Sequence, residues 1–113
     1  MSWRAGNASE DGHANRGWFI GSFIGDALRG TEDVELKWGE HARGERRLAW
    51  AEGDARSSAS ILVSGRFRIE LADGSVVLER PGDYLIWGPG VGHTWEAEED
   101  SVVLTVRWPS AGP

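Results

Sequence analysis

One histidine of this chain stands where a side chain could do chemistry. His93 follows the turn "GPGVG" and opens the stretch "HTWEA", in which alternation places Trp95 on the same face. An imidazole titrates near neutral pH, so it can ligate a metal ion or act as a general acid or base. A histidine at the start of a strand can also be only a hydrogen-bonded structural residue. The residues opposite His93 therefore decide its role.

Two acids and two serines lie in the stretch that could face this histidine. Glu52 and Asp54 could join His93 in a metal site with two carboxylates and one imidazole, or they could simply face water in a hydrophilic turn. Divalent transition metals prefer imidazole or thiolate ligands, and the chain has no cysteine. Ser58 and Ser60 share one face of a predicted strand. The sequence therefore favours a metal-free pocket and predicts no cofactor.

Seven tryptophans supply large apolar surfaces, which could form a pocket or fill a small core. Trp38, with Leu36, is predicted to point into the interior, and Trp87 is also assigned to the core. An aromatic wall could hold a sugar ring, an aromatic ring or a cation. His41, in the turn "WGEHARGE", is predicted to lie at the surface. The predicted ligand-binding residues are Trp50, Ser58, Ser60, His93 and Trp95.

The composition limits the setting and the partners. The net charge of -6 disfavours nucleic acid and anionic membrane surfaces as partners. The start of the chain lacks the apolar core of a secretory signal, and no apolar stretch approaches the ~20 residues of a membrane span. With the absence of cysteine, these features predict a cytoplasmic protein, and a bacterial source is expected.

Alternation and turn signals divide the chain into short strands. Residues 1–16 are polar and are predicted to form a flexible N-terminal arm, and residues 17–113 to form a single domain. Eight or nine strands are expected, with no segment of helical period. "RFRIEL" alternates cleanly and "ADGS" carries a hairpin signal. "RRLAWAE" is predicted to be a strand with Leu48 and Trp50 on one face. The last strand is expected to place four side chains on one face: Val102, Leu104, Val106 and Trp108. This series predicts an all-β sandwich or barrel.

The stretch "GDYLIWGPGVGH" resembles the second motif of the cupin family, which has a glycine, an apolar run, a Pro-x-Gly turn and a histidine. Gly82 begins it, Pro89 and Gly90 make the turn, and His93 closes it. "SASILVSGRFRIEL", which contains Gly65, looks like the end of the first motif. The resemblance runs from about residue 34 to 108. It implies a jelly-roll β-barrel of two packed antiparallel sheets with a pocket in its mouth.

The resemblance also implies a metal site, and there the chain departs from the family. The implied ligands are His-x-His and a glutamate before Gly65, with His93 as the later ligand. Counting back from Gly65, Ser58 stands in the glutamate position. The two earlier histidine positions hold other residues: Glu52 and Asp54 or, with a gap longer by one residue, Ala51 and Gly53. Of the implied ligands, only His93 is present.

Two classes of function stay open. The first is a metal-free cupin-like protein that binds a small organic ligand in an aromatic-lined pocket. The second is an enzyme: an isomerase, epimerase or lyase with His93 as acid or base, helped by Ser58 or Glu52, or a metal enzyme with Glu52, Asp54 and His93 as ligands. A collapsed barrel without a pocket is a third, structural reading. The apolar segment "GWFIGSFI", residues 17–24, is predicted to be an edge strand that packs on a second copy in a homodimer.

Overall fold

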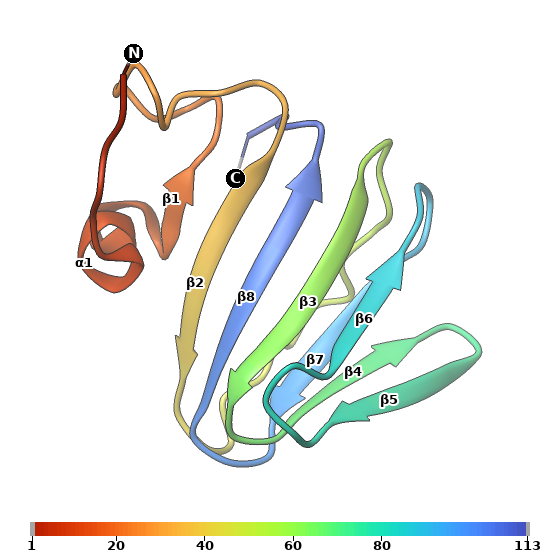
Figure 1. Ribbon diagram of the computed structural model, residues 1–113. Helices are drawn as coiled ribbons and strands as arrows, with labels where there is room; N and C mark the ends of the chain where they lie inside the picture. The colour runs from red at the N-terminus through yellow and green to blue at the C-terminus, as the bar shows by residue number, and fades with distance from the viewer. Residues whose placement is uncertain (1, 113) are drawn as a thin grey trace.

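Two antiparallel sheets make up the structure, a computed structural model that describes residues 2–112 (Figure 1). The larger sheet has the strand order β1-β2-β8-β3-β6 and the smaller sheet the order β5-β4-β7. The strands are β1 (Trp18–Ile20), β2 (Glu35–His41), β3 (Ser57–Ser64), β4 (Phe67–Leu71), β5 (Gly74–Leu78), β6 (Tyr84–Trp87), β7 (His93–Ala97) and β8 (Ser101–Trp108). The predicted all-β class with two packed antiparallel sheets is confirmed.

The smaller sheet forms as its sequence predicts. Leu71 pairs with Gly74, so Ala72 and Asp73 make a two-residue hairpin turn between β4 and β5. The inward residues of β4 contribute to a core that lies between the sheets. Its buried members come from both sheets: Leu62, Phe67, Ile69, Leu78, Ala97 and Val103. Gly65 joins β3 to β4 with a φ of +97°, and a Cβ there would lie 2.2 Å from the Asp100 carbonyl oxygen, so this turn requires glycine.

The two faces of β2 are the reverse of the sequence prediction. On β2, Glu35 and Gly39 are buried and Lys37 faces the interior, so alternation puts Leu36 and Trp38 on the outer face. The prediction that Leu36 and Trp38 point inward is wrong. Alternation separates the two sets of side chains correctly, but it does not state which set faces the core.

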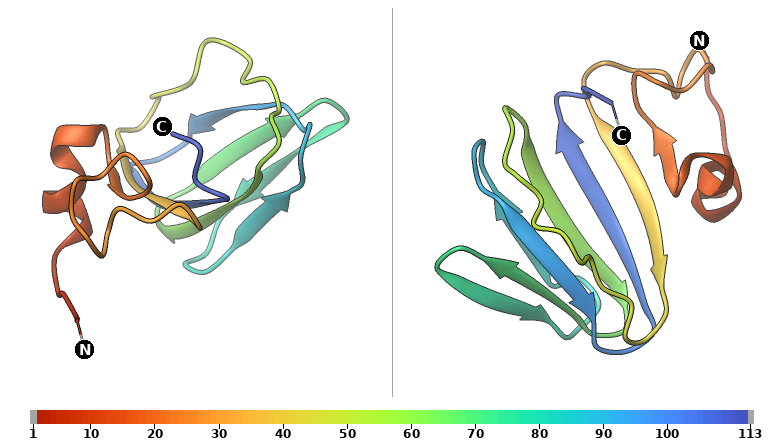
Figure 2. Two further views of the ribbon diagram at one scale, coloured as in Figure 1. Left: turned by 90° about the horizontal axis from the view of Figure 1, so that it is seen from above. Right: turned by 180° about the vertical axis from the view of Figure 1, so that it is seen from behind.

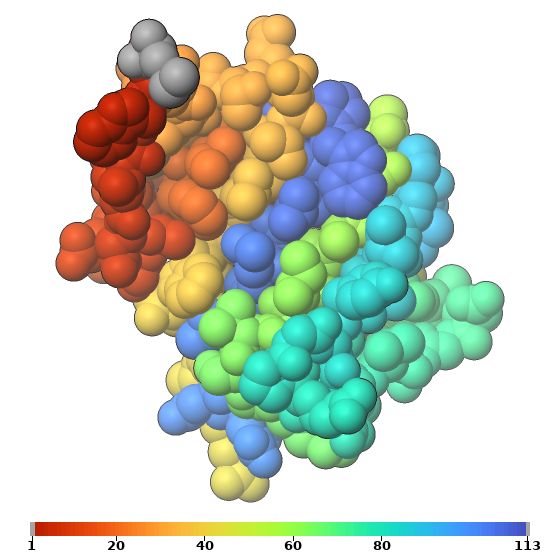
Figure 3. All heavy atoms as spheres, in the orientation of Figure 1, coloured from red at the N-terminus to blue at the C-terminus, as the bar shows by residue number. Residues whose placement is uncertain are grey.

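The aliphatic side of β8 faces outward together with that of β2. Leu36 pairs with Val106 and Trp38 pairs with Leu104, so these four side chains share the outer face. Further apolar side chains on this face come from β3 and β6: Ala59, Ile61, Tyr84 and Ile86. Tyr84 is 65% exposed and Ile86 is 55% exposed. Figure 3 shows β2, β8, β3 and β6 side by side at this surface. The homodimer stays a prediction. A second copy would have the apolar side chains of this outer face to cover, in addition to those of β1.

The connection from β2 to β3 runs along the edge of β7 (Figure 2). Ala51 and His93 exchange backbone hydrogen bonds of 2.8 and 2.9 Å, and Arg46 forms a bridge with Glu96. Pairing is limited to these single bridges, and Leu48 is 84% exposed. The prediction of a strand at "RRLAWAE" is therefore wrong, although the segment does lie beside the smaller sheet.

A short helical segment precedes the sheets where the sequence predicts no helix. Helix α1 (Ala8–Gly12) and the 3-10 turn η1 (His13–Asn15) pack against β1, which is an edge strand as expected. The division into an arm of residues 1–16 and a domain of residues 17–113 stays a prediction. None of the helices within residues 2–112 has the length and apolar composition of a membrane span.

Two isoleucines give a matched test of which sheet faces are inside. Ile69 is 1% exposed and Ile86 is 55% exposed. We expect Ile69→Ala to lower the free energy of unfolding by about 2–5 kcal/mol, because it removes buried methyl groups and leaves a cavity. Ile86→Ala should cost about 1 kcal/mol or less. Urea unfolding measures both changes, and equal losses would contradict the assignment of the faces.

Candidate functional site

A cavity of about 450 Å³ lies between the two sheets. Its wall combines the inner face of the larger sheet with side chains of β4 and β7 and with residues of the β2–β3 connection. In Figure 2, left, this connection arches beside the two sheets. Four of the five predicted ligand-binding residues line the cavity: Ser58, Ser60, His93 and Trp95. The open cavity argues against a collapsed barrel.

His93 enters this cavity from the first position of β7. Its ring lies against Trp87, with the ring centroids 4.7 Å apart. The Nδ1 atom is buried and has no hydrogen-bond partner among residues 2–112. Burial lowers the pKa of His93, and the positive charges of Arg47 and Arg107 lower it further. The imidazole is therefore neutral at neutral pH, and it keeps an unused polar atom at the cavity.

His41 is part of an aromatic cluster, so the prediction of a surface histidine is wrong. Its side chain is 11% exposed, and its ring centroid lies 4.5 Å from that of Trp95 and 5.4 Å from that of Phe67. Its Nδ1 lies 3.1 Å from a carboxylate oxygen of Glu45. His41 stands three residues after Trp38 in the same strand, so it takes the opposite face. That face is the inner one.

Trp87 and Trp50 differ from their predicted roles. Trp87, assigned to the core, lines the cavity. Trp50, predicted to bind the ligand, is 42% exposed and does not line the described cavity. Its indole packs on Gly92, where an added Cβ would lie 2.4 Å from Trp50 Nε1. Because Trp50 is not in a strand, alternation does not determine the direction of its side chain.

The positions of the implied metal site do gather beside His93. Ala51, Gly53 and Ser58 all line the cavity with it, and Ala51 is paired with His93 through the backbone. Their side chains, however, are a methyl group, a hydrogen and a hydroxyl. A transition metal needs several imidazole, thiolate or carboxylate donors. Within the described part of the chain, no group of three or more His, Cys, Asp and Glu residues is placed to hold a metal ion.

The two acids of the alternative metal site also line the cavity, but they do not gather around His93. The Asp54 carboxylate accepts hydrogen bonds of 2.6 and 3.0 Å from the Arg56 guanidinium. These hydrogen bonds hold the pKa of Asp54 below its usual range. Glu52 is exposed. The residues present therefore do not fit the metal that the resemblance implies.

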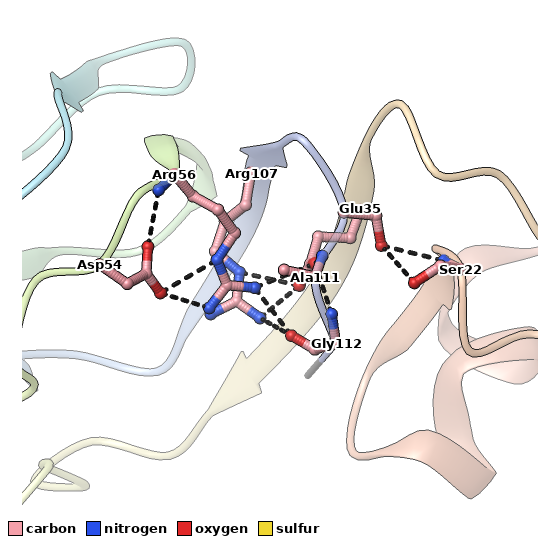
Figure 4. Close-up of polar contacts among 8 residues, drawn as sticks. Ser22, Glu35, Asp54, Arg56, Arg107, Ala111 and Gly112 are labelled. Atoms are coloured by element: carbon pink, nitrogen blue, oxygen red, sulfur yellow. Dashed lines mark hydrogen bonds and ion pairs between the residues drawn. The ribbon is translucent and has the colours of Figure 1, made fainter.

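A buried carboxylate, that of Glu35, binds two of the arginines that line the cavity. Glu35 is fully buried, and its Oε1 accepts hydrogen bonds of 3.0 Å from Arg56, 2.7 Å from the Ala111 N–H and 3.2 Å from the Gly112 N–H. Its Oε2 accepts from Arg107 Nε at 2.9 Å and also from Arg107 Nη2. Figure 4 shows these groups converging from β2, β8, the β2–β3 connection and the C-terminal segment. We call them the Glu35 cluster.

The Glu35 cluster keeps its carboxylate charged despite burial. Burial opposes the ionisation of Glu35, but the Ala111 N–H and the guanidinium groups of Arg107 and Arg56 outweigh it, so the pKa of Glu35 is lowered. The guanidinium of Arg107 also lies 4.1 Å from the centroid of the Trp18 ring. The cluster therefore fixes both arginines in the cavity wall.

Sequence reasoning missed Glu35 and Lys37 because it placed Leu36 and Trp38, on the other side of the same strand, toward the interior. One signal was available. Glu35 and Arg107 carry opposite charges, and they stand directly opposite each other in the β2–β8 ladder. That signal becomes visible only once the two strands, far apart in sequence, are known to be neighbours.

Comparison with known proteins identifies the fold. No protein-family model and no curated protein matches the sequence. Among solved structures, KdgF from Halomonas sp. is similar with a TM-score of 0.65 and 24% identity, over 72% of this chain and 74% of that chain. A cupin superfamily protein from Desulfitobacterium hafniense DCB-2 has a TM-score of 0.61 and 18% identity, over 69% of each chain. An RmlC-like cupin from Shewanella frigidimarina NCIMB 400 has a TM-score of 0.55 and 15% identity, over 70% of this chain and 78% of that one.

These similarities show that the chain has the cupin fold, which confirms the resemblance carried by its second motif. At these identities the similarities establish the fold alone, because one fold hosts many unrelated functions.

The Glu35 cluster predicts a pH-dependent contribution to stability. We expect Glu35→Gln to lower the free energy of unfolding at neutral pH by about 3 kcal/mol, because Arg56 and Arg107 lose their shared counter-charge. The pKa of Glu35 is lower in the folded chain, so its contribution is complete above the ordinary carboxyl pKa of about 4.3 and is lost as the pH falls through the lowered value. Urea unfolding of both proteins should show a difference that shrinks toward acidic pH.

Asp54 provides the matched control for this measurement. Its carboxylate also pairs with Arg56, but its side chain is 50% exposed. Asp54→Asn should therefore cost about 1 kcal/mol or less. If Glu35→Gln were no more destabilising than Asp54→Asn, the Glu35 cluster would not have the role assigned to it.

The environment of His93 predicts its titration. Because burial and two nearby arginines disfavour the imidazolium, the ring protons of His93 should titrate with a midpoint below the ordinary value of about 6.5. Proton NMR follows this signal, and the His93→Gln variant identifies it by its loss. A midpoint above 6.5 would contradict the described surroundings, since it would require a carboxylate beside the ring.

Proposed function

We propose that this cupin-fold protein binds a small organic molecule in the cavity between its sheets, without a metal ion. The observation that carries the proposal is the composition of the cavity wall. The buried hydroxyl groups of Ser58 and Ser60 and the ring of Trp87 come from the larger sheet, and Trp95 and the neutral imidazole of His93 come from the smaller sheet. Aromatic surface that packs on a ligand, together with polar groups that fix its orientation, is what a concave small-molecule site requires.

The volume of the cavity supports the same proposal. About 450 Å³ falls within the range of about 300–1,000 Å³ that small-molecule sites occupy. The metal-free part of the proposal is supported by the donor set, because Ala51, Gly53 and Ser58 offer no strong metal ligand beside His93. In this proposal, the side chains of the cavity wall bind the small molecule directly, without a metal ion.

A second candidate is an acid–base enzyme that uses His93. The observation in its favour is the buried Nδ1 atom, which has no partner among the described residues, on a neutral ring at the cavity. A neutral imidazole can accept a proton from a bound molecule, as an isomerase, epimerase or lyase requires. Ser58 also lines the cavity and is a candidate helper. His93→Gln separates the two functions, since it would abolish turnover in an enzyme while a binding protein would keep its ligand with altered affinity.

A variant that fills the cavity tests the proposed function. Ring-bearing solutes, such as sugars, aromatic acids and their amides, are screened for a rise in the thermal midpoint of unfolding. A compound present at 100 times its Kd should stabilise the wild type by about 2.7 kcal/mol. Ser60→Leu places a large side chain in the cavity, so the same compound should no longer stabilise it. Ser60 is 5% exposed in the unliganded chain.

Ser64→Leu is the matched control, because Ser64 lies at the exposed end of the same strand. It should respond to the compound as the wild type does. The proposal fails if no solute of the panel raises the midpoint, or if a stabilising compound acts equally on Ser60→Leu, which would place its site outside the cavity.

A further inference from the structure

Positive charge is concentrated at the cavity although the chain as a whole is acidic. The net charge of the chain is -6, and it has 12 Lys and Arg residues. Five of these cations line the cavity: Arg16, Lys37, Arg47, Arg56 and Arg107. Only two acids line it with them, Glu52 and Asp54. This positive charge disfavours a cationic ligand, which an aromatic wall alone could have bound.

Two of the five cations already have partners inside the protein. Arg56 binds Glu35 and Asp54, and Arg107 binds Glu35. Arg16, Lys37 and Arg47 differ: among residues 2–112, none of them forms an ion pair with a carboxylate. The cavity wall therefore presents uncompensated positive charge.

Lys37 is the most confined of these uncompensated cations, and it is the only lysine in the chain. It faces inward from β2 between Glu35 and Gly39, and its Nζ lies 5.9 Å from the centroid of the Trp18 ring. Burial lowers the pKa of Lys37, and the neighbouring positive charge of Arg107 lowers it further. A cation in such surroundings is stabilised when an anion is brought to it.

We propose that the cavity selects an organic acid, whose carboxylate pairs with Lys37 while its apolar or ring body lies against Trp87 and Trp95. This inference rests on the proposed function and names the class of its ligand. The hydroxyl groups of Ser58 and Ser60 lie in the same wall and supply neutral hydrogen-bonding groups. An apolar ring with one anionic group matches both parts of the wall.

Matched acids and amides test the proposal, because the two members of a pair differ mainly in charge. The probes are benzoate and benzamide, phenylacetate and phenylacetamide, and cyclohexanecarboxylate and its amide, with inorganic phosphate as a simple anion. We expect at least one acid to bind more tightly than its amide, as measured by calorimetry and by the thermal midpoint. Lys37→Met should weaken that acid about tenfold or more and leave the amide unchanged.

Two control variants accompany Lys37→Met. Arg80→Met removes a cation that is 86% exposed and outside the cavity wall, and it should leave acid binding unchanged. Lys37→Arg keeps the charge and should retain most of the affinity. If Lys37→Met fails to fold, acetylation of the wild-type chain gives the same answer. Because Lys37 is the only lysine, peptide mapping follows its modification alone, and the acid should slow it while the amide should not.

The outcomes separate the inference from the function on which it rests. If amides bind as tightly as acids, or if Lys37→Met leaves acid binding intact, the selection of an acid is refuted and small-molecule binding stands. If inorganic phosphate binds as well as the acids, the site recognises charge alone and the inference is also refuted. If none of these acids binds while another solute of the wider panel does, the inference is refuted and the proposed function stands; if no solute of that panel binds either, both fail.

Discussion

The buried carboxylate of Glu35 is the interaction on which the arrangement of the larger sheet depends. It accepts hydrogen bonds from Arg56, Arg107 and the backbone N–H groups of the C-terminal segment. Burying a lone carboxylate would cost several kcal/mol, so Glu35 can face inward only while these donors are present. With Glu35 inside, the period of two in β2 requires Lys37 and Gly39 to be inside as well. The polar side of the strand thus becomes the wall of the cavity.

This orientation explains two features together. The inner face of the larger sheet is polar where it meets the cavity, and apolar packing is concentrated where β3 and β8 meet the smaller sheet, at Leu62, Val103 and Ile69. The outer face, in turn, carries aliphatic and aromatic side chains that a monomer leaves partly exposed, Tyr84 and Ile86 among them. If these apolar side chains faced inward instead, they would fill the space between the sheets and leave no room for a ligand. The chain therefore has an open cavity between its sheets, and its apolar side chains lie on the outer surface instead.

Much of the fold could be predicted from the sequence, because local signals determine it. Clean alternation and an Asp-Gly turn specify the β4–β5 hairpin, and the motif that ends at His93 indicates the cupin fold. The site could be predicted only in part. Ser58, Ser60 and His93 follow from alternation and from the motif, whereas Lys37 and the Glu35 cluster depend on which face of β2 is inside. The inward orientation of Glu35 depends on its pairing with Arg107, which is 72 residues away in the sequence. A local sequence pattern does not show such a pairing.

The central claim is that the inward polar face of β2 forms a cavity that binds an organic acid through Lys37. A crystal structure of the protein with 4-bromobenzoate tests it most directly, because the anomalous signal of bromine locates the ring independently of the refined coordinates. The account predicts one bromine peak inside the cavity, beside Trp87 and Trp95, with the carboxylate on Lys37. A cavity that Leu36 and Trp38 fill from the opposite face of β2, or a bromine peak found only on the outer surface, would contradict it.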